Sequence, residues 1–285
     1  MEFPSPVKTF HDDTYPSINP TLSQLSTKGK NIVISGGGSG IGPGIAHSFA
    51  KSGASSISIF GRTQKSLLQT KEALSKDYPN TKIYTYVADI TEKSTLDTTF
   101  QAVKSTVGSV DVLIANAGYI PDLHSIAASN ADNWWAGFEI NVRGAFNLIS
   151  SFVPVASKNA SIINISTAVA HMPYAPGFCG YAVSKLAGTR VFDYAAHEYP
   201  EFFVLSVHPG VIETAMNAKV VAAGMNYPHD TIELPADFEV WAVSLEANFL
   251  RGKLVWSNWD VDELKAMEKE IEGTDKFTLG LFGWP

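Results

Sequence analysis

The chain lacks the features that would place it outside the reducing interior of a cell. Its 285 residues include a single cysteine, Cys179, so no intrachain disulfide is possible and a reducing compartment is expected. No apolar run approaches the roughly 18–20 residues that span a bilayer. The N-terminus has neither the basic nor the apolar region of a secretory signal. We therefore expect a cytoplasmic protein without a membrane partner.

Basic runs and metal-ligand spacings are missing as well. The net charge is −7 and no Lys/Arg-rich segment occurs, which argues against nucleic acid as a partner. The histidines form no metal-binding spacing and there are no paired cysteines, so we assign no metal. The hydrophobic content of 45% is nevertheless enough for a full core. A globular protein without a metal or nucleic-acid ligand is expected.

Short apolar runs alternate with longer mixed segments from Lys30 onward. Several runs are continuously apolar, which is typical of parallel strands covered on both faces. The expected strands are residues 31–35, 56–60, 82–88, 110–115, 160–166, 203–208 and 253–256, and the expected helices are residues 41–52, 64–76, 91–107, 133–155 and 181–198. This alternation predicts an α/β fold: one doubly wound parallel sheet of about seven strands with helices on both faces. Proline-rich residues 1–28 are expected to form an extended arm on a single domain of residues 29–285.

A glycine-rich segment lies between the first expected strand and the first expected helix. Its spacing is Gly-x3-Gly-x-Gly at Gly36, Gly40 and Gly42, with Ile41 between the last two. Glycines in such a turn let backbone N–H groups approach a pyrophosphate closely, and the helix N-terminus adds a favourable dipole. The segment predicts a dinucleotide site. A glycine loop without function is the alternative, which the position between strand and helix disfavours.

Acidic residues are absent between Gly36 and Lys71. In a dinucleotide fold, a carboxylate near the end of the second strand would hold the ribose 2′-hydroxyl of NAD. Arg62 stands there instead, and arginine forms charge-assisted hydrogen bonds with a 2′-phosphate. NADP is therefore favoured over NAD. The alternative is a solvated arginine that only opens the next helix.

Tyr181 and Lys185 stand four residues apart on an expected helix and therefore share one face. A free tyrosine has a pKa of about 10, and a neighbouring ammonium stabilises the phenolate, so we expect Lys185 to lower the pKa of Tyr181. Tyr181 would then be a general acid towards a carbonyl oxygen, or a base in the reverse direction. A surface pair without function is the alternative, which the upstream dinucleotide segment disfavours.

The glycine segment followed by Tyr-x3-Lys resembles the short-chain dehydrogenase/reductase family. The resemblance covers roughly residues 30–256 and implies a Rossmann fold with a nicotinamide cofactor. It also implies four catalytic residues, which are Asn141, Thr167, Tyr181 and Lys185, the last of them holding the nicotinamide ribose as well. Thr167 stands where the family commonly has serine, and Ser166 is the alternative hydroxyl residue.

The resemblance implies further cofactor contacts at the ends of successive strands. They are Asp89 and Ile90 after the third strand, Asn116 and Gly118 after the fourth, and Ile212 and Thr214 after the sixth. The family's members also form oligomers through the helices expected at residues 133–155 and 181–198, so a homodimer or homotetramer is expected. The N-terminal arm and the tryptophan-rich ending resemble fungal members, often from secondary metabolism.

Three functions are compatible with these residues. The leading hypothesis is an NADP-dependent oxidoreductase that transfers a hydride between NADPH and the carbonyl or alcohol group of a medium-to-large apolar substrate. The apolar residues before Tyr181 and after Thr214 favour such a substrate. A non-redox relative, such as a cyclase, dehydratase or isomerase that retains the cofactor site, is the alternative that the threonine at position 167 favours. A catalytically silent binding protein ranks last, because the glycine segment and the Tyr-x3-Lys pair are both present.

Overall fold

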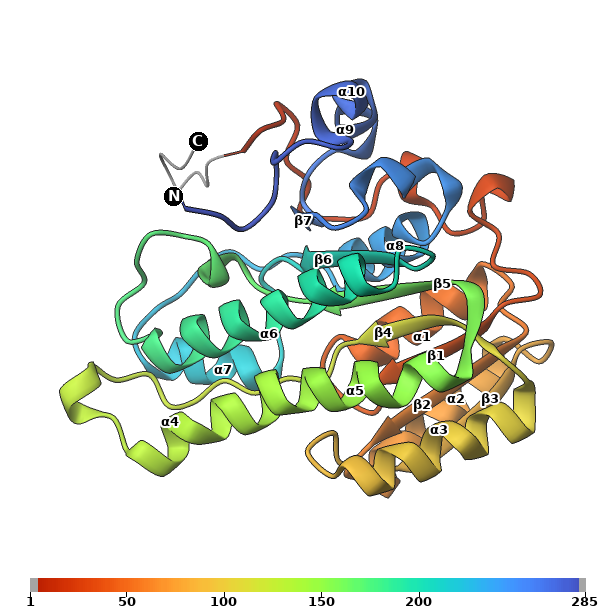
Figure 1. Ribbon diagram of the computed structural model, residues 1–285, viewed down its shortest axis with the longest axis horizontal. Coiled ribbons are helices and arrows are strands. Elements are labelled where there is room, and N and C mark those ends of the chain that lie inside the picture. The colour runs from red at the N-terminus through yellow and green to blue at the C-terminus, as the bar shows by residue number, and fades with distance from the viewer. Residues whose placement is uncertain (1–4, 282–285) are drawn as a thin grey trace.

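The computed structural model describes residues 5–281 and contains a seven-stranded parallel sheet between two layers of helices (Figure 1). The strands are β1 (Asn31–Ser35), β2 (Ser56–Gly61), β3 (Lys82–Val87), β4 (Val110–Ala115), β5 (Ala156–Ile165), β6 (Phe203–His208) and β7 (Leu254–Trp256). Their order is β3-β2-β1-β4-β5-β6-β7, and each neighbouring pair is parallel. The expected fold class is confirmed.

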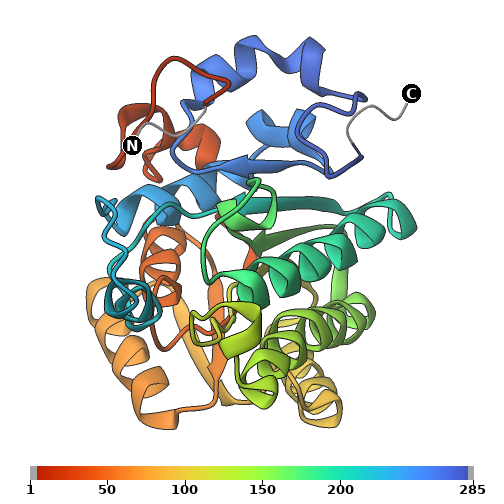
Figure 2. The same cartoon turned by 90° about the vertical axis from the view of Figure 1, so that its left-hand side faces the viewer.

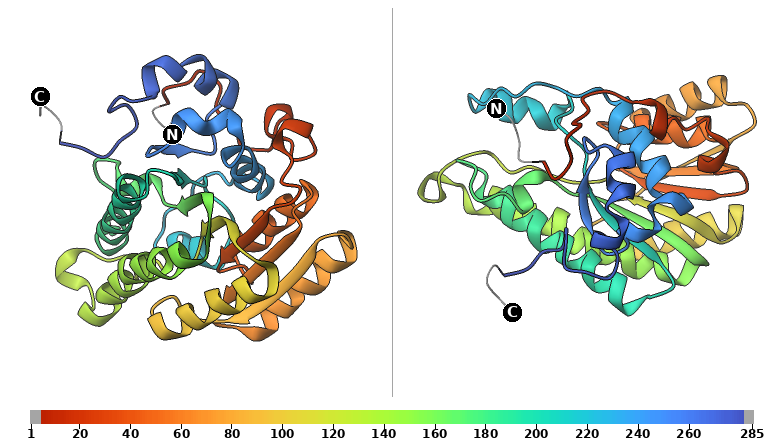
Figure 3. Two further views of the ribbon diagram at one scale, coloured as in Figure 1. Left: turned by 45° about the vertical axis from the view of Figure 1, so that its right-hand side comes forward. Right: turned by 90° about the horizontal axis from the view of Figure 1, so that it is seen from above.

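The two large apolar clusters of the core lie one on each face of the sheet, and a third, smaller cluster surrounds Tyr181. One face is covered by α1 (Gly42–Lys51), α2 (Gln64–Asp77) and α8 (Glu233–Ala242). The other is covered by α3 (Lys93–Val107), α5 (Gly144–Phe152) and α6 (Cys179–Glu198), as the views in Figure 3 show. Successive strand residues point to opposite faces, so Ile32 and Ile34 enter the first cluster and Val33 the second.

The helix expected at residues 133–155 differs from the observed structure in both its start and its continuity. It begins earlier, as α4 (Ala131–Phe138), because the Asn130 side chain accepts a hydrogen bond of 2.9 Å from the Asn133 N–H and caps the first turn. A π-helical turn, Glu139–Arg143, separates α4 from α5. A 3-10 turn, Val153–Val155, then leads directly into β5 at Ala156, ahead of the expected start at residue 160.

The polypeptide after β6 contains short helices that the sequence pattern did not indicate. They are α7 (Ala215–Ala222), α8, α9 (Val261–Ala266) and α10 (Glu268–Ile271). Helix α8 is almost entirely buried against the sheet, whereas only Val220 is buried in α7. In neither α7 nor α8 do apolar residues recur strongly every 3.6 residues, so periodicity does not predict either helix.

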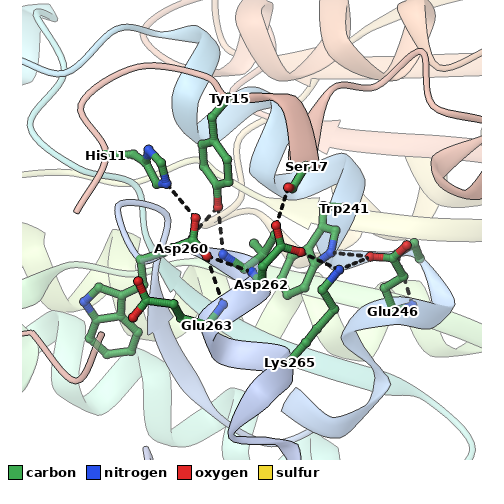
Figure 4. A network of polar contacts seen from close by, with 12 residues as sticks. His11, Tyr15, Ser17, Trp241, Glu246, Asp260, Asp262, Glu263 and Lys265 are labelled. Atoms are coloured by element: carbon green, nitrogen blue, oxygen red, sulfur yellow. Dashed lines mark hydrogen bonds and ion pairs between the residues drawn. The ribbon is translucent and has the colours of Figure 1, made fainter. Parts of the chain in front are cut away.

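The N-terminal segment from residue 5 lies against β7, α8 and α9 (Figure 2). Figure 4 shows its polar contacts: His11 Nε2 lies 2.9 Å from Asp260 Oδ2, and Tyr15 Oη accepts a 3.0 Å hydrogen bond from the Val261 N–H. Residues 1–4 of the expected arm and 282–285 of the expected domain lie outside the described residues. Within residues 5–281, no helix combines the length and the apolar character needed to cross a membrane.

Candidate active site

A cleft of about 350 Å³ opens at the carboxyl ends of the strands, where the strand order changes direction between β1 and β4. The expected site residues that line it are Gly36, Gly40, Ile41, Arg62, Asp89, Ile90, Asn116, Gly118, Tyr181, Lys185 and Thr214. Four others, Gly42, Asn141, Thr167 and Ile212, lie outside this lining. Ile165 and Ser166 at the end of β5 line the cleft as well, so the topology brings residues from six strand ends to one small-molecule site.

The glycine turn after β1 requires glycine for two different reasons. Gly36 and Gly40 have φ angles of +68° and +60°, which side-chain-bearing residues rarely adopt. A Cβ atom on Gly42 would clash with the Gly36 carbonyl oxygen, so Gly42 lets α1 pack onto the turn. The first N–H groups of α1 have no side-chain cap, which leaves these donors at the cleft. The turn therefore fits the pyrophosphate of a dinucleotide.

Hydrogen bonds between β1 and β4 hold this turn in place. Ser35 Oγ accepts bonds from the N–H groups of Asn116 and Ala117, at 2.9 and 3.0 Å. The side-chain nitrogen of Asn116 donates to the carbonyls of Ser35 and Gly36, at 3.0 and 3.2 Å. Asn116 therefore lines the cleft while its amide supports the phosphate turn. Sequence reasoning missed this role of Ser35.

The distal end of the cleft follows β2 and β3. Arg62 is exposed in the cleft wall, and no carboxylate within residues 5–281 forms an ion pair with it. Asp89 Oδ1 accepts two 2.9 Å hydrogen bonds from the N–H and hydroxyl groups of Thr91, which fixes its carboxylate. Ile90 beside it is buried and supplies an apolar surface. This end therefore offers one unpaired cation together with a polar and an apolar wall.

Tyr181 and Lys185 lie on the first turns of α6 at the opposite end of the cleft. Burial lowers the pKa of Lys185 from 10.5 to about 8, and its Nζ donates a 2.7 Å hydrogen bond to the Ile165 carbonyl. Burial raises the pKa of Tyr181 to about 12, while a hydrogen bond with the Thr167 side chain lowers it. The expected lowering by Lys185 is therefore wrong for the chain by itself, because burial dominates. Tyr181 is a neutral phenol at physiological pH.

The two hydroxyl residues after β5 point in different directions. Ser166 Oγ lies 2.8 Å from Thr189 Oγ1, beneath α6. The Thr167 side chain instead makes the hydrogen bond with Tyr181. Adjacent residues at a strand end face opposite sides, so one of the two reaches the phenol. The structure places Thr167 at the phenol, whereas Ser166 lines the cleft.

Asn141 occupies the π-helical turn between α4 and α5. Its Nδ2 donates to the Tyr119 carbonyl at 2.8 Å and to Ser184 Oγ at 3.0 Å, while its Oδ1 accepts from the Tyr119 N–H at 2.9 Å. Its backbone carbonyl faces α6 so closely that a Cβ atom on Gly188 would clash with it. π-Helical turns are rare in proteins, and those that occur are often at functional sites. Gly188 thus allows the Asn141 turn to pack closely on α6, a supporting role that was missed from the sequence although its place three residues after Lys185 was an available signal.

The segment after β6 ends the cleft. Ile212 is buried and pairs through its backbone with Asp230. Thr214 Oγ1 accepts a 3.2 Å hydrogen bond from the Asn217 N–H and caps α7. Met216 follows in α7, and the Tyr181 hydroxyl group donates to its Sδ at 3.8 Å. The sequence predicts apolar residues after Thr214 in general, and this contact of the Met216 sulfur atom does not follow from it.

Comparison with known proteins identifies the family. A family model described as short chain dehydrogenase matches residues 30–224. The chain belongs to the short-chain dehydrogenase/reductase family. It is accordingly an NAD(P)-dependent oxidoreductase.

Fungal family members are similar over almost the whole chain. A short chain dehydrogenase/reductase of Claviceps purpurea is 32% identical over 98% of this chain and 94% of its own length. The short chain dehydrogenase/reductase AacuD of Aspergillus aculeatus is 33% identical over 98% of this chain and 97% of its own. The expected fungal type is confirmed.

Solved structures show the same fold at lower identity. The oxidoreductase yciK from E. coli superposes with a TM-score of 0.77 at 21% identity, covering 83% of this chain and 97% of that one. L-sorbose reductase from Gluconobacter frateurii, complexed with NADPH and L-sorbose, gives a TM-score of 0.73 at 24% identity, covering 82% of this chain and 96% of that one.

Proposed function

We propose that this enzyme transfers a hydride between NADPH and the carbonyl or alcohol group of a medium-to-large apolar substrate. The observation that carries the proposal is that Tyr181, which lines the cleft beginning at the glycine turn, makes a hydrogen bond with the Thr167 side chain behind it. NADPH supplies the hydride when it is bound. Tyr181, kept protonated by burial, donates its proton to the substrate oxygen as the carbonyl is reduced. The Thr167 hydroxyl orients that oxygen.

The remaining site residues hold the cofactor in this proposal. The pyrophosphate would lie on the turn of Gly36, Gly40, Ile41 and Gly42, the adenosine beside Asp89, Ile90 and Asn116, and the nicotinamide riboside near Gly118, Lys185, Ile212 and Thr214. Asn141 positions the Lys185 side of α6 through the π-helical turn. Its side chain donates to Ser184 and its carbonyl lies against Gly188, so it supports α6 without lining the cleft.

Arg62 is the basis for proposing NADPH over NADH. An exposed, unpaired guanidinium at the distal cleft wall complements a 2′-phosphate, and hydrogen bonds with charged groups contribute about 1.5–3 kcal/mol. We expect Arg62→Ala to weaken NADPH binding about tenfold to a hundredfold and to leave NADH within about twofold. Fluorescence titration of both cofactors measures this. Lys76→Ala removes another exposed charge, at the far end of α2, and serves as the control. Equal losses for both cofactors would make Arg62 structural.

Apolar side chains around Tyr181 support an apolar substrate. The cluster contains Ile120, Phe178 and Val220, with Met216, Met225 and Tyr227 packed against it. A panel of apolar ketones and aldehydes with NADPH, followed at the nicotinamide absorbance, tests the proposal. Reduction of at least one such ketone is expected. Substrate conversion without any change of that absorbance would point instead to a cyclase, dehydratase or isomerase.

We also propose an assembly and a setting for the enzyme. Exposed Trp135, Phe146 and Tyr194 on α4, α5 and α6 support a homodimer or homotetramer formed through these helices. Light scattering that gives the monomer mass of 30.8 kDa at micromolar concentration would contradict this. Residues 1–28 would act as an arm of one catalytic domain, residues 29–285, in the cytoplasm. A role in secondary metabolism belongs to the same proposal and rests on the resemblance to fungal members.

A further inference from the structure

Helix α1 follows the phosphate turn directly, yet its own sequence stabilises it little. It begins Gly42-Pro43-Gly44 and is 10 residues long. Glycine is a poor helix former, and helices of fewer than about 12 residues are marginal without packing. The position in which the first N–H groups of α1 face the cleft therefore depends on contacts with the rest of the protein.

Helix α8 supplies such contacts at two points of α1. At the first, Gly44 lies so close to Ile232 that a Cβ atom on the glycine would be 2.8 Å from the isoleucine side chain. At the second, about one turn further along α1, Ser48 Oγ donates a 2.6 Å hydrogen bond to Asp237 Oδ1. Ser48 and Asp237 are both buried, so water does not compete for this bond. Helix α8 thus holds α1 beside the phosphate turn and again one turn beyond it.

The N-terminal arm reaches the same buried carboxylate from the other side. Thr14 Oγ1 donates a 2.7 Å hydrogen bond to Asp237 Oδ2, while Oδ1 accepts from Ser48. Among the ion pairs of residues 5–281, none includes Asp237. A buried carboxylate that loses a hydrogen bond is destabilised strongly. Asp237 therefore couples the position of the arm to the position of α1.

The arm also holds α8 at the end that touches Gly44. The Thr231 N–H donates to the Asp12 carbonyl at 2.8 Å, and the Thr231 hydroxyl donates to Asp13 Oδ1 at 2.6 Å. Thr231 directly precedes Ile232, the residue that packs on Gly44. Arm, α8 and α1 are therefore connected at both points of contact.

We propose that the N-terminal arm is a clamp that preorganises the cofactor site, with Asp237 as the positioning residue that joins it to α1. A displaced α1 would not present the phosphate turn to the cleft. The measured cofactor affinity is therefore the intrinsic affinity multiplied by the fraction of molecules that have α1 in place. The clamp goes beyond the proposed function, because it acts on the pyrophosphate that NADPH and NADH share.

Cofactor titration of the full-length protein tests the clamp through Thr14. We expect Thr14→Val to weaken NADPH and NADH binding equally, by about twofold to tenfold, the factor of one net hydrogen bond. Thr14→Ser retains the hydroxyl and should bind both cofactors like the wild type. Thr21→Val is the matched control, because Thr21 is an exposed threonine of the same arm whose hydroxyl donates within the arm, to Asn19 Oδ1 at 2.9 Å. Wild-type affinity in Thr14→Val, or an equal loss in Thr21→Val, overturns the clamp.

Hydrogen exchange without cofactor separates a displaced α1 from a general loss of stability. Thr14→Val and Ser48→Ala should each accelerate amide exchange in residues 42–51 by up to about tenfold. Residues 93–107 of α3, on the opposite face of the sheet, should exchange as in the wild type. Equal acceleration in both helices would mean that the arm stabilises the whole fold, and the clamp would be wrong.

The double variant tests whether the connection runs through Asp237. Once Ser48→Ala has removed the bond between α1 and the carboxylate, Thr14→Val should change neither exchange in residues 42–51 nor cofactor affinity any further. Effects of the two substitutions that multiply independently would overturn the role of Asp237. These measurements use no substrate, so failure to reduce any ketone would refute the proposed function and leave the clamp to be decided by exchange and titration.

Discussion

The two halves of the cleft differ in what lines them: backbone in the cofactor half and side chains in the substrate half. The cofactor half is made of backbone: positive φ angles at Gly36 and Gly40, and a helix packed so tightly that Gly42 has no room for a Cβ atom. The substrate half is made of apolar side chains from several elements, among them Ile120, Phe178 and, on α7, Met216. Backbone geometry specifies one common ligand, whereas side chains can differ from one family member to the next and so allow many substrates. The difference separates what the family shares from what each member selects.

Tyr181 lies at the boundary between the two halves of the cleft. Removing its hydroxyl group should therefore abolish hydride transfer without lowering the affinity for the cofactor. Tyr181→Phe keeps the ring but has no proton to give, and we expect kcat to fall about 10²–10⁴-fold with NADPH affinity unchanged. Single-turnover absorbance and fluorescence titration measure the two quantities. Tyr194→Phe, which alters an exposed tyrosine on the same helix, should retain wild-type activity. Wild-type turnover by Tyr181→Phe would refute the assignment of the proton donor.

Lys185 is a charged residue buried where the two halves of the cleft meet, so its effect on the free energy of unfolding reports on the packing at that boundary. Its folded pKa of about 8 lies below the ordinary 10.5, so the folded state disfavours the ammonium. The unfolded chain therefore holds more protons between these values, and the stability contributed by this group rises as the pH increases from about 8 to 10.5. At pH 7 the full cost is present, about 3 kcal/mol by the usual conversion.

We expect Lys185→Met to be inactive and to show this cost as a pH-dependent difference from the wild type. Urea unfolding of both proteins at pH 7 and at pH 10.5 should show the wild type gaining about 3 kcal/mol relative to the variant. Ionisations that the two proteins share cancel in the difference. A constant difference across this range would mean that Lys185 has an ordinary pKa in the fold.

The same contrast explains what could be predicted from the sequence. The seven strands and the glycine turn follow from apolar runs and from residue types that only one backbone geometry accommodates. The pKa of Tyr181 could not be predicted, because burial by Met216 and its neighbours dominates and depends on where α7 packs. Helix α7 has no recurring spacing of apolar residues that would predict it. Its Lys219 hydrogen-bonds Ile120 and Asp122, which lie about a hundred residues earlier in the chain. Long-range packing of side chains therefore accounts for most of what was missed.

Gly42 tests whether the cofactor half is as tightly packed as its backbone indicates. Gly42→Ala adds a methyl group against the Gly36 carbonyl, and overpacking of this kind costs about 1–3 kcal/mol. We expect a loss of stability in that range together with weaker binding of NADPH and NADH alike. Gly280→Ala is the control, because a Cβ atom there meets no neighbour within 4 Å. If both variants unfold and bind like the wild type, the turn adapts and the contrast between the halves weakens.

Replacing Thr167, on the substrate side of the boundary, is expected to have the smallest effect on activity. Valine keeps the shape of threonine and removes the hydroxyl, so a loss of activity reports a hydrogen bond and not a cavity. A net hydrogen bond contributes about 0.5–1.5 kcal/mol, and we expect Thr167→Val to lower kcat about twofold to tenfold while Thr167→Ser retains activity. Ser166→Ala should affect stability more than kcat, because the Ser166 hydroxyl contacts Thr189 beneath α6. Steady-state kinetics of the three variants with one ketone decides whether Thr167 or Ser166 contacts the substrate. A damaging Ser166→Ala beside a silent Thr167→Val would assign the substrate contact to Ser166 and place the Thr167 hydroxyl outside the reaction.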